Sequence, residues 1–444
     1  MSGAGAGESF VVVGAGLAGA LMATLLGRAG HRVLVLERRA DPRKGTAEAG
    51  RSINLAISAR GLYALEQIGL RDEILEAATP LYGRMIHPVA GPLAFQPYGT
   101  RGHAINSISR ADLNVALLDA AERSGLVTIR FGRRCTEVDP AGGWAETVDA
   151  GSGNAPERHR GTILGADGAY SAVRAHLQRR ERYDYSQDYL AHGYKELHIP
   201  AADDESPRLD RHALHIWPRG GYMMMAMANR DASFTVTLYL AFEGADSFAL
   251  LRTPDDVRRF FDRTFPDAPA LLPGLATEFF ANPTGTLVTI RSRPWHVNGT
   301  VALLGDACHA IVPFFGQGAN AAFEDCLALA AALDRHPTDR ARAFQEYEAE
   351  RLPNANAIAD LALANFHEMR DHVASPLFRL QKRGEVVLHR LFPRWFVPLY
   401  TMISFTRIPY AEARDRARRQ ARAVQGILAV LGLGIVAAVW LLLR

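Results

Sequence analysis

The chain has 444 residues, 48% of them hydrophobic, so it is long and apolar enough to bury a large core. Its 50 lysines and arginines nearly balance 47 aspartates and glutamates, and a net charge of +3 lacks the basic excess of a dedicated nucleic-acid-binding protein. Three widely spaced cysteines, Cys135, Cys308 and Cys326, do not form the pattern of a disulfide framework or zinc site, and we expect a reducing compartment. Residues 1–7 lack the features of a secretory signal.

The chain opens with the pattern of a βαβ unit. An apolar strand over 10–13, a glycine-rich turn, a helix over 20–28 and a second strand over 32–37 follow one another. The turn reads GxGxxG and the second strand ends in Glu37. Glycines at these positions let the backbone approach a pyrophosphate, the helix start offers free N–H groups, and a carboxylate can accept hydrogen bonds from a ribose. The unit therefore predicts a dinucleotide site.

Further along, the pattern changes twice. Helices are expected over 59–70 and over 109–124, the second with Ser109 as its N-cap, and an apolar strand ends at Leu164. Consecutive strands with tight turns are then expected over 192–200, 213–218, 222–228, 233–242 and 285–293. A buried strand over 300–304, a long helix from Asn320 and amphipathic helices over 339–370 and 374–419 complete the body. Antiparallel strands between βαβ elements indicate a second domain inserted into the first.

Two more motifs point to a flavin. Residues 165–174 (GADGAYSAVR) resemble the DG motif of flavin-dependent aromatic hydroxylases, and residues 305–318 (GDACHAIVPFFGQG) resemble their GD motif. An aspartate after a strand can bind a ribityl hydroxyl, and a helix entered at 316–320 can turn N–H groups toward the flavin pyrimidine. We predict bound FAD, held by Gly14, Gly16, Leu17, Gly19, Glu37, Arg38, Ala56, Arg110, Cys135, Asp167, Ser171, Asp306, Pro313, Gly316, Gly318, Ala319 and Asn320.

These patterns together predict an α/β fold with four parts. A Rossmann-like FAD-binding domain carries an inserted antiparallel β-sheet domain for the substrate, and C-terminal helices and a terminal transmembrane helix follow. The expected bounds are 1–80, 100–190 and 296–340 for the FAD-binding domain, 81–99 and 191–295 for the substrate domain, 341–422 for the helices and 423–443 for the transmembrane helix.

The transmembrane prediction comes from the end of the chain. Residues 426–443 carry no charge, and at about 1.5 Å per residue such a helix approaches the roughly 30 Å of a bilayer core. A basic cluster precedes it, which favours a single-pass anchor with the catalytic body on the cytoplasmic side. The alternative is a C-terminal helix buried in the core. The cluster consists of Arg414, Arg416, Arg418, Arg419 and Arg422.

Several strings resemble the kynurenine 3-monooxygenase family in particular: 50–56 (GRSINLA), 84–87 (RMIH), 97–100 (PYGT), 183–187 (YDYSQ), 192–194 (HGY), 214–219 (LHIWPR), 368–370 (EMR) and 398–402 (PLYTM). The resemblance implies hydroxylation of L-kynurenine to 3-hydroxy-L-kynurenine with O2, through a flavin C4a-hydroperoxide, in tryptophan catabolism towards NAD synthesis. It implies NADPH as a transient reductant but does not separate NADPH from NADH. Eukaryotic family members also carry C-terminal membrane segments. The oligomeric state stays open.

The resemblance also implies a substrate site. Arg84 matches the family's carboxylate anchor, for which a bidentate guanidinium is suited. Arg84 and Tyr98 are equally far from Gly91, so a hairpin turning there would place them opposite each other. Asn365 and Glu368 share a helical face, and the family places them at the polar end of the substrate. Tyr400 matches a further contact, and Phe314 and Phe315 are expected to line the side of the aromatic ring.

The sequence departs from the family at a few positions. Cys308 and Ala319 replace an alanine and a methionine that are usual beside the flavin, and Phe366 and His367 replace tyrosine and isoleucine. We expect His309 to pack near the flavin rather than act as a base, and we predict no metal and no dedicated catalytic side chain. The alternative function is another membrane-bound flavin hydroxylase, for instance of a quinone precursor, which would need no anchor at position 84.

Overall fold

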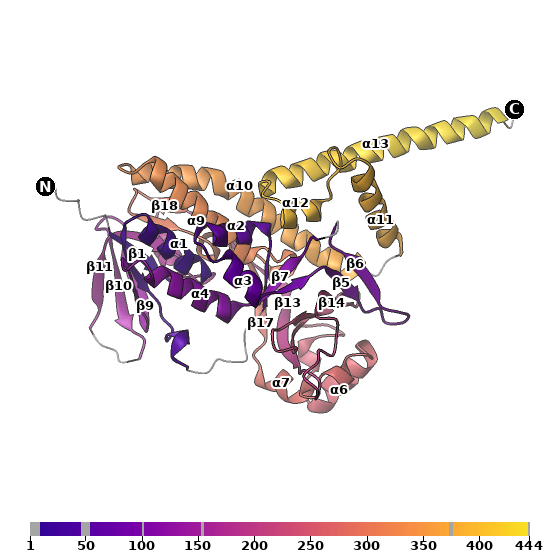
Figure 1. Cartoon of the computed structure of the whole chain (residues 1–444), viewed down its shortest axis with the longest axis horizontal. Helices are drawn as coiled ribbons and strands as arrows, with labels where there is room; N and C mark the ends of the chain where they lie inside the picture. Colours follow the sequence, from indigo (N-terminus) through magenta and orange to yellow (C-terminus); the bar gives the residue numbers. More distant parts are fainter. Residues whose placement is uncertain (1–8, 46–53, 100–101, 152–154, 373–375, 443–444) are drawn as a thin grey trace.

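The computed structural model describes residues 9–45, 54–99, 102–151, 155–372 and 376–442, without side chains at 371–379, 383, 428, 431–439 and 441–442. Figure 1 shows two sheet-containing parts side by side, with the C-terminal helices packed along them and a long last helix leading to the C-terminus. Each part has its own hydrophobic core. The functional residues come from both parts.

A six-stranded sheet in the order β18-β19-β12-β1-β2-β8 forms the first part. All its neighbouring strands are parallel except β18 and β19, and β1 is an apolar run of the kind typical of strands buried on both faces. The predicted βαβ unit is confirmed, with α1 as the crossover. The bounds are β1 Ser9–Val13, α1 Leu17–Arg28, β2 Arg32–Leu36, β8 Val127–Arg130, β12 Thr162–Gly165, β18 His296–Val297 and β19 Val301–Leu303.

Helices and two small sheets complete the first part. Helix α1 packs against α4 and α9, and α10 packs against α9. Ser109 caps α4 as predicted, since its hydroxyl accepts the N–H of Asp112 at 3.3 Å. The helices are η1 Pro42–Lys44, α2 Ala59–Gln67, α3 Arg71–Ala77, α4 Arg110–Glu122, α5 Ala172–Leu177, α8 Asp306–His309, η4 Pro313–Phe315, α9 Gly318–Arg335 and α10 Arg340–His367. The small sheets are β3 Asn54–Ile57, β7 Ile105–Ser109 and β4 Thr79–Leu81, and β11 Glu157–Arg160, β10 Trp144–Asp149 and β9 Arg133–Asp139.

A seven-stranded sheet, ordered β17-β13-β16-β15-β14-β5-β6, forms the second part. The predicted mid-chain strands are confirmed, although β13 begins earlier than expected, and the early strands β5 and β6 join its edge. The domain bounds themselves remain a prediction. The elements are β5 Gly83–Ile86, β6 Ala94–Pro97, β13 Asp184–Ile199, β14 Ala213–Pro218, β15 Met223–Ala228, β16 Phe234–Ala241 and β17 Gly285–Arg293, with η2 Phe248–Leu250, α6 Pro254–Thr264, η3 Pro269–Leu271 and α7 Leu275–Ala281.

The C-terminal region is more broken than expected. After α10 come a π-helical turn, η5 (Glu368–His372), and then α11 (Pro376–Leu391), α12 (Leu399–Phe405) and α13 (Tyr410–Leu442). The stretch over 374–419 that was predicted to be helical is therefore divided among three helices, and residues 374 and 375 lie outside the described residues. Prolines at 393, 398 and 409 account for the breaks, because proline lacks an N–H and clashes with the preceding turn.

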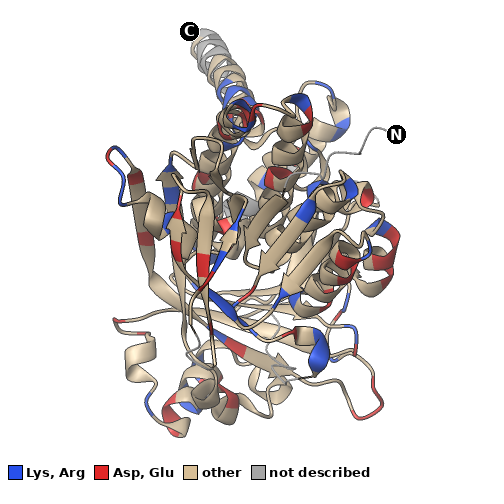
Figure 2. Ribbon diagram, turned by 90° about the vertical axis from the view of Figure 1, so that its left-hand side faces the viewer, with Lys and Arg blue, Asp and Glu red and all other residues tan. Residues whose placement is uncertain are grey.

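The expectation of a transmembrane helix over 423–443 is not supported. No helix in the described part of the chain is long and apolar enough to cross a membrane. The arginine cluster at 414–422 lies on α13 before the predicted span. Figure 2 shows these charged positions gathered where α13 joins the body. The side chains at 428, 431–439 and 441–444 lie outside the described residues.

Candidate functional site

The turn between β1 and α1 is shaped by its glycines. Gly14 has φ +102°, and a Cβ there would lie 2.5 Å from the carbonyl oxygen of Ala166, while a Cβ at Gly19 would collide with the carbonyl of Gly14. Gly16 differs, because nothing lies within 4 Å of the position that its Cβ would take. Gly14 and Gly19 are needed for the turn itself, whereas Gly16 keeps the N-terminus of α1, at Leu17, open to a ligand. This geometry fits a pyrophosphate.

Glu37, just beyond β2, is held as an ionised acceptor beside this turn. Its Oε2 accepts the N–H of Ala15 at 2.8 Å, and its Oε1 accepts the N–H and Nε of Arg39 at 3.0 and 2.9 Å. Burial opposes ionisation, but the bonds from Arg39 and the backbone outweigh it and hold the pKa of Glu37 below its usual range. The neighbouring Arg38 is exposed. The position and charge of Glu37 fit a ribose diol.

The DG motif builds the start of α5. Asp167 Oδ2 accepts the N–H groups of Ala172 and Val173 at 2.7 and 3.2 Å, and Ser171 caps the same helix. Asp167 Oδ1 is buried and has no hydrogen-bond partner among the described residues. Burial raises the pKa of Asp167. The pKa of the Cys135 thiol is raised to about 12, mainly by burial and secondly by the negative charge of Asp167. Two predicted cofactor residues thus lie together, with one polar atom left to bind a ligand.

The GD motif follows β19 at the carboxyl edge of the sheet. Asp306 is accessible to solvent but has protein around it, and these surroundings raise its pKa while the nearby Arg110 acts in the opposite direction. Gly316 has φ +64°, and a Cβ there would lie 3.0 Å from that of Ala56. Asn320 donates to the carbonyls of Ala56 and Gly316 at 2.8 and 2.9 Å. The loop containing Pro313, Gly318 and Ala319 is therefore fixed against β3, where a flavin ring would meet it.

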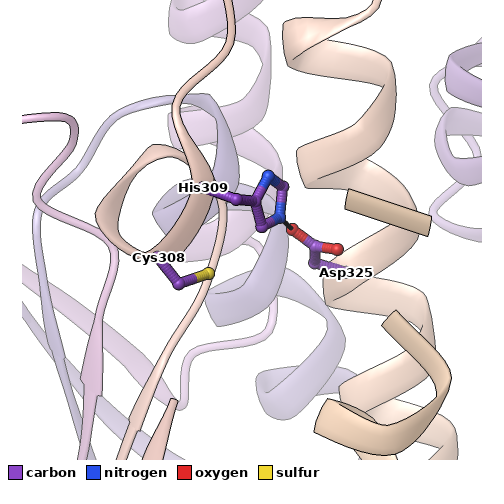
Figure 3. Close-up of side chains that lie close together, drawn as sticks. All are labelled: Cys308, His309 and Asp325. Atoms are coloured by element: carbon purple, nitrogen blue, oxygen red, sulfur yellow. Dashed lines mark hydrogen bonds and ion pairs between the residues drawn. The ribbon is translucent and has the colours of Figure 1, made fainter. Parts of the chain in front are cut away.

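His309 is hydrogen-bonded to Asp325, as Figure 3 shows. Its Nε2 lies 2.5 Å from Asp325 Oδ2, while Asp325 Oδ1 accepts Arg351 Nε at 2.8 Å. Cys308, His309 and Asp325 are close enough to hold a cation. Because Asp325 is already neutralised by Arg351, this buried cluster is better described as an ion-pair network than as a metal site. The Nε2 of His309 is thus occupied by a carboxylate.

The hairpin that carries Arg84 has a different register from the one predicted. Arg84 lies opposite Gln96, and Tyr98 donates its backbone N–H to Tyr82 at 3.0 Å. The prediction that Arg84 and Tyr98 lie directly opposite each other is therefore wrong, because the connection over 87–93 is centred one residue before Gly91. Alternate residues still share a face. The Arg84 guanidinium accordingly lies 5.7 Å from the Tyr98 ring centroid.

Aromatic rings surround this guanidinium. Arg84 lies 5.1 Å from the Tyr400 ring, Tyr98 stacks on Tyr400 at 5.0 Å, and Phe315 stacks on Tyr400 at 5.7 Å. Burial raises the pKa of both tyrosines, so they remain phenols able to donate hydrogen bonds. Burial tends to lower the pKa of Arg84, but the two tyrosines and Glu368 raise it above its usual range. The Nε of Arg84 is buried and has no hydrogen-bond partner among the described residues.

The remaining predicted substrate residues are Asn365, Glu368 and Phe314, and two of them contact each other. Asn365 donates to the carbonyl oxygen of Phe314 at 2.6 Å, and the Phe314 ring stacks on Phe366 at 4.3 Å. Glu368 begins η5, half-buried, with Lys382 at 3.7 Å. Tyr239 of β16, which sequence reasoning missed, lies 4.9 Å from Phe314, and only its alternation within the strand could have suggested it. The turn η4, which carries Phe314 and Phe315, thus contacts Asn365 and Tyr400 among the other predicted substrate residues.

Comparison with known proteins gives a consistent result. A family model described as an FAD binding domain matches residues 9–362. The kynurenine 3-monooxygenase of Myxococcus xanthus (strain DK1622) is 48% identical over 91% of this chain and 87% of its own length, and that of Stenotrophomonas maltophilia (strain K279a) is 47% identical over 94% and 91%.

Solved structures share the architecture at lower identity. A 2-methyl-3-hydroxypyridine-5-carboxylic acid oxygenase has a TM-score of 0.69 at 21% identity, covering 84% of this chain and 95% of its own. Pseudomonas aeruginosa PqsL in complex with 2-aminobenzoylacetate has a TM-score of 0.65 at 22% identity, covering 82% and 97%. At these identities the likeness shows the fold alone.

Proposed function

Because this chain belongs to the kynurenine 3-monooxygenase family of FAD-dependent monooxygenases, we propose that it hydroxylates L-kynurenine at ring position 3. NADPH supplies two electrons, one atom of O2 enters the ring, and the other leaves as water. The observation that carries the proposal is the buried Nε of Arg84, which has no hydrogen-bond partner in the described part of the chain and lies among aromatic rings that contact the loop of the GD motif.

The predicted cofactor residues fit FAD. In this proposal Gly14, Gly16 and the start of α1 hold the pyrophosphate, and Glu37 binds the ribose. Asp306 binds the ribityl chain, and the N–H groups at 316–320 face the pyrimidine. When bound, FAD supplies the electron transfer and the activation of O2. The unpartnered Oδ1 of Asp167 and the open space at Gly16 support this assignment.

The amino-acid end of L-kynurenine fits the polar end of the cage. Its carboxylate accepts charge-assisted bonds from Arg84 and from the phenols of Tyr98 and Tyr400, while Glu368 attracts its α-ammonium. Asn365 belongs to the same end and also fixes the carbonyl of Phe314. In this arrangement the carboxylate of the substrate meets the positive charge of Arg84, and its ammonium group meets the negative charge of Glu368.

At the aromatic ring of L-kynurenine, the protein has to exclude water rather than supply an acidic or basic side chain. The ring amino group of L-kynurenine already makes the adjacent ring position electron-rich, so no side chain has to create the nucleophile. Phe314 and Phe315 are 5% and 7% exposed, and they cover this end of the cage. The Nε2 of His309, the histidine of the GD motif, is hydrogen-bonded to Asp325. The residues of the chain thus bind and orient the substrate and keep the site dry.

Anaerobic reduction of the flavin tests this proposal. L-Kynurenine should accelerate bleaching of the flavin by NADPH, whereas an analogue without the carboxylate, kynuramine, should accelerate it much less at the same concentration. NADH in place of NADPH tests the choice of reductant. Equal reduction rates with and without L-kynurenine would reject the proposal, and equal stimulation by both compounds would reject the carboxylate anchor.

A further inference from the structure

Arg60 connects the cofactor-binding part of the chain to the segment that carries Tyr400. It lies on α2, and only 1% of it is exposed. Its Nε donates to the carbonyl oxygen of Ile403 at 2.9 Å, and its second terminal nitrogen donates to the carbonyls of Met402, at 3.3 Å, and Ile408. One guanidinium therefore holds three carbonyls across the break between α12 and α13.

Two of these carbonyls, those of Met402 and Ile403, lie in the last turn of α12, and that of Met402 also accepts the hydroxyl of Thr406 at 2.6 Å. A helix of seven residues has little stability by itself, and the carbonyls of its last turn have no partner within the helix. A cation at this end satisfies the carbonyls and also interacts favourably with the helix dipole. Arg60 further lies 4.0 Å above the ring of Tyr410, which begins α13. Arg60 therefore fixes the end of α12 and the start of α13 together.

On its other side, Arg60 is anchored to the flavin loop through buried charges. Glu324 accepts Arg60 at 2.7 Å and Arg351 at 3.1 Å, and Arg351 in turn binds Asp325. Asp325 holds His309 and accepts the N–H of Gly305 at 3.2 Å. The chain of contacts thus runs from α12 to the GD motif through side chains that are buried except for the partly exposed Glu324.

A second contact runs in parallel to this network. The hydroxyl of Tyr410 donates to Gln317 Oε1 at 2.9 Å, in the loop expected to meet the flavin. Ser58, two residues before Arg60, hydrogen-bonds the same oxygen at 3.4 Å. The C-terminal segment is therefore fixed to this loop at two points, one charged and one neutral.

We propose that Arg60 is a positioning residue for the substrate site: by clamping the α12–α13 junction it holds Tyr400 against Arg84, Tyr98 and Phe315. This inference rests on the proposed function only in taking L-kynurenine as the substrate. Loss of the clamp leaves the FAD residues in place and loosens one wall of the cage. Substrate affinity and coupling of NADPH oxidation to hydroxylation should then fall more than the maximal rate.

The test compares Arg60→Met, Arg60→Lys and the control Arg43→Met as FAD-loaded full chains. Arg43 is a suitable control because its guanidinium likewise binds three acceptors, the carboxylates of Asp41, Asp119 and Glu122, none of which lies near α12. Arg60→Met should raise KM for L-kynurenine by at least about tenfold with kcat within about threefold, and should increase hydrogen peroxide per NADPH. Arg60→Lys, which keeps the charge without the fork, should recover part of the loss. Arg43→Met should behave as the unaltered protein.

Hydrogen exchange without substrate gives a second readout that does not depend on the reaction. Amides over 399–410 should exchange about tenfold faster in Arg60→Met, while those of β1 and α1 stay unchanged. Unaltered exchange over 399–410 together with unaltered KM would overturn the inference. If the unaltered protein does not respond to L-kynurenine, the proposed function fails, and exchange alone still decides the clamp.

The Tyr410→Phe variant keeps the inference testable if Arg60→Met does not fold. It removes only the hydroxyl bonded to Gln317 and leaves the ring under Arg60. It should raise KM and the exchange over 399–410 in the same direction but by a smaller factor. If Arg60→Met fails to hold FAD and Tyr410→Phe leaves both quantities unchanged, the inference is rejected.

Discussion

At the scale of single residues, the account depends on a guanidinium that the protein does not fully satisfy. A buried N–H without a partner costs about 1–3 kcal/mol, so it persists where a ligand can repay the cost. Arg84 has such an Nε, and the groups around it are phenols and a carboxylate rather than a close ion-pair partner. An acidic ligand is the simplest partner for that arrangement.

Replacing Arg84 by methionine should therefore affect binding first. We expect KM for L-kynurenine to rise on the order of 100-fold, because truncating one partner of a buried charge pair costs about 2–5 kcal/mol. Arg84→Lys should lie between, since an ammonium cannot bind a carboxylate bidentately. Steady-state kinetics with L-kynurenine checks both. A KM unchanged in Arg84→Met would favour a substrate without a carboxylate, such as a quinone precursor.

At the scale of elements, the turn between β1 and α1 separates what the fold needs from what the cofactor needs. Gly14 has a φ that L side chains rarely adopt and touches Ala166, whereas Gly16 has φ −71° and an open Cβ position. The two glycines of one motif therefore serve different purposes. Their substitution should have different consequences.

Gly14→Ala should lower the free energy of unfolding of the protein without FAD by about 1–3 kcal/mol, because of backbone strain and the contact with Ala166. Gly16→Ala should leave that free energy nearly unchanged and weaken FAD binding, since only the ligand would meet the added methyl group. Denaturation of both variants, with FAD removed and with FAD added, checks this. Equal losses in the two FAD-free variants would contradict the distinction.

The strand β14 carries a buried histidine that should make stability depend on pH. His215 Nδ1 lies 2.9 Å from His87 Nε2, its Nε2 lies 2.9 Å from the carbonyl of Asp210, and His87 reaches Asp267 at 2.6 Å. Burial is the main cause that lowers the pKa of His215 from 6.5 to about 4. Between these values the unfolded chain binds a proton that the folded protein does not, so stability falls as pH falls through this window.

Between pH 7 and pH 4 the free energy of unfolding of the unaltered protein should accordingly fall by about 3 kcal/mol more than that of the His215→Gln variant. The glutamine keeps a hydrogen-bond donor and an acceptor at this position. Asp267, whose pKa is also lowered in the folded protein, adds a loss only below its ordinary value of 3.8. Urea denaturation at pH 7, 6, 5 and 4 measures the difference. Parallel curves for the two proteins would show that His215 does not titrate as described.

At the scale of the whole molecule, the sequence predicted what local patterns encode. The βαβ unit, the mid-chain strands and the cap at Ser109 follow from periodicity and side-chain chemistry over a few residues. The register at Arg84, the breaks around α12 and the part played by Arg60 depend on contacts between residues far apart in the chain. Arg60 and Ile403 are 343 positions apart, and no spacing rule connects them.

The same contrast applies to the site. Motifs placed the cofactor residues at strand ends, and the structure brings Asp167 near Cys135 and Asp306 near Arg110. The pairing of Arg84 with Tyr98 was predicted from the hairpin, although in the wrong register, and their meeting with Tyr400 came from the family resemblance, because that segment lies far away in the chain. The transmembrane expectation rested on the uncharged run, the basic cluster before it and the family resemblance, and the described helices do not support it.

The most direct measurement of the central claim is the fate of oxygen during turnover. The FAD-loaded protein would be given L-kynurenine, NADPH and 18O2, and the product analysed by mass spectrometry and NMR. We expect 3-hydroxy-L-kynurenine with one 18O atom on the ring. Consumption of NADPH with only labelled hydrogen peroxide, or a hydroxyl group at another ring position, would contradict the account.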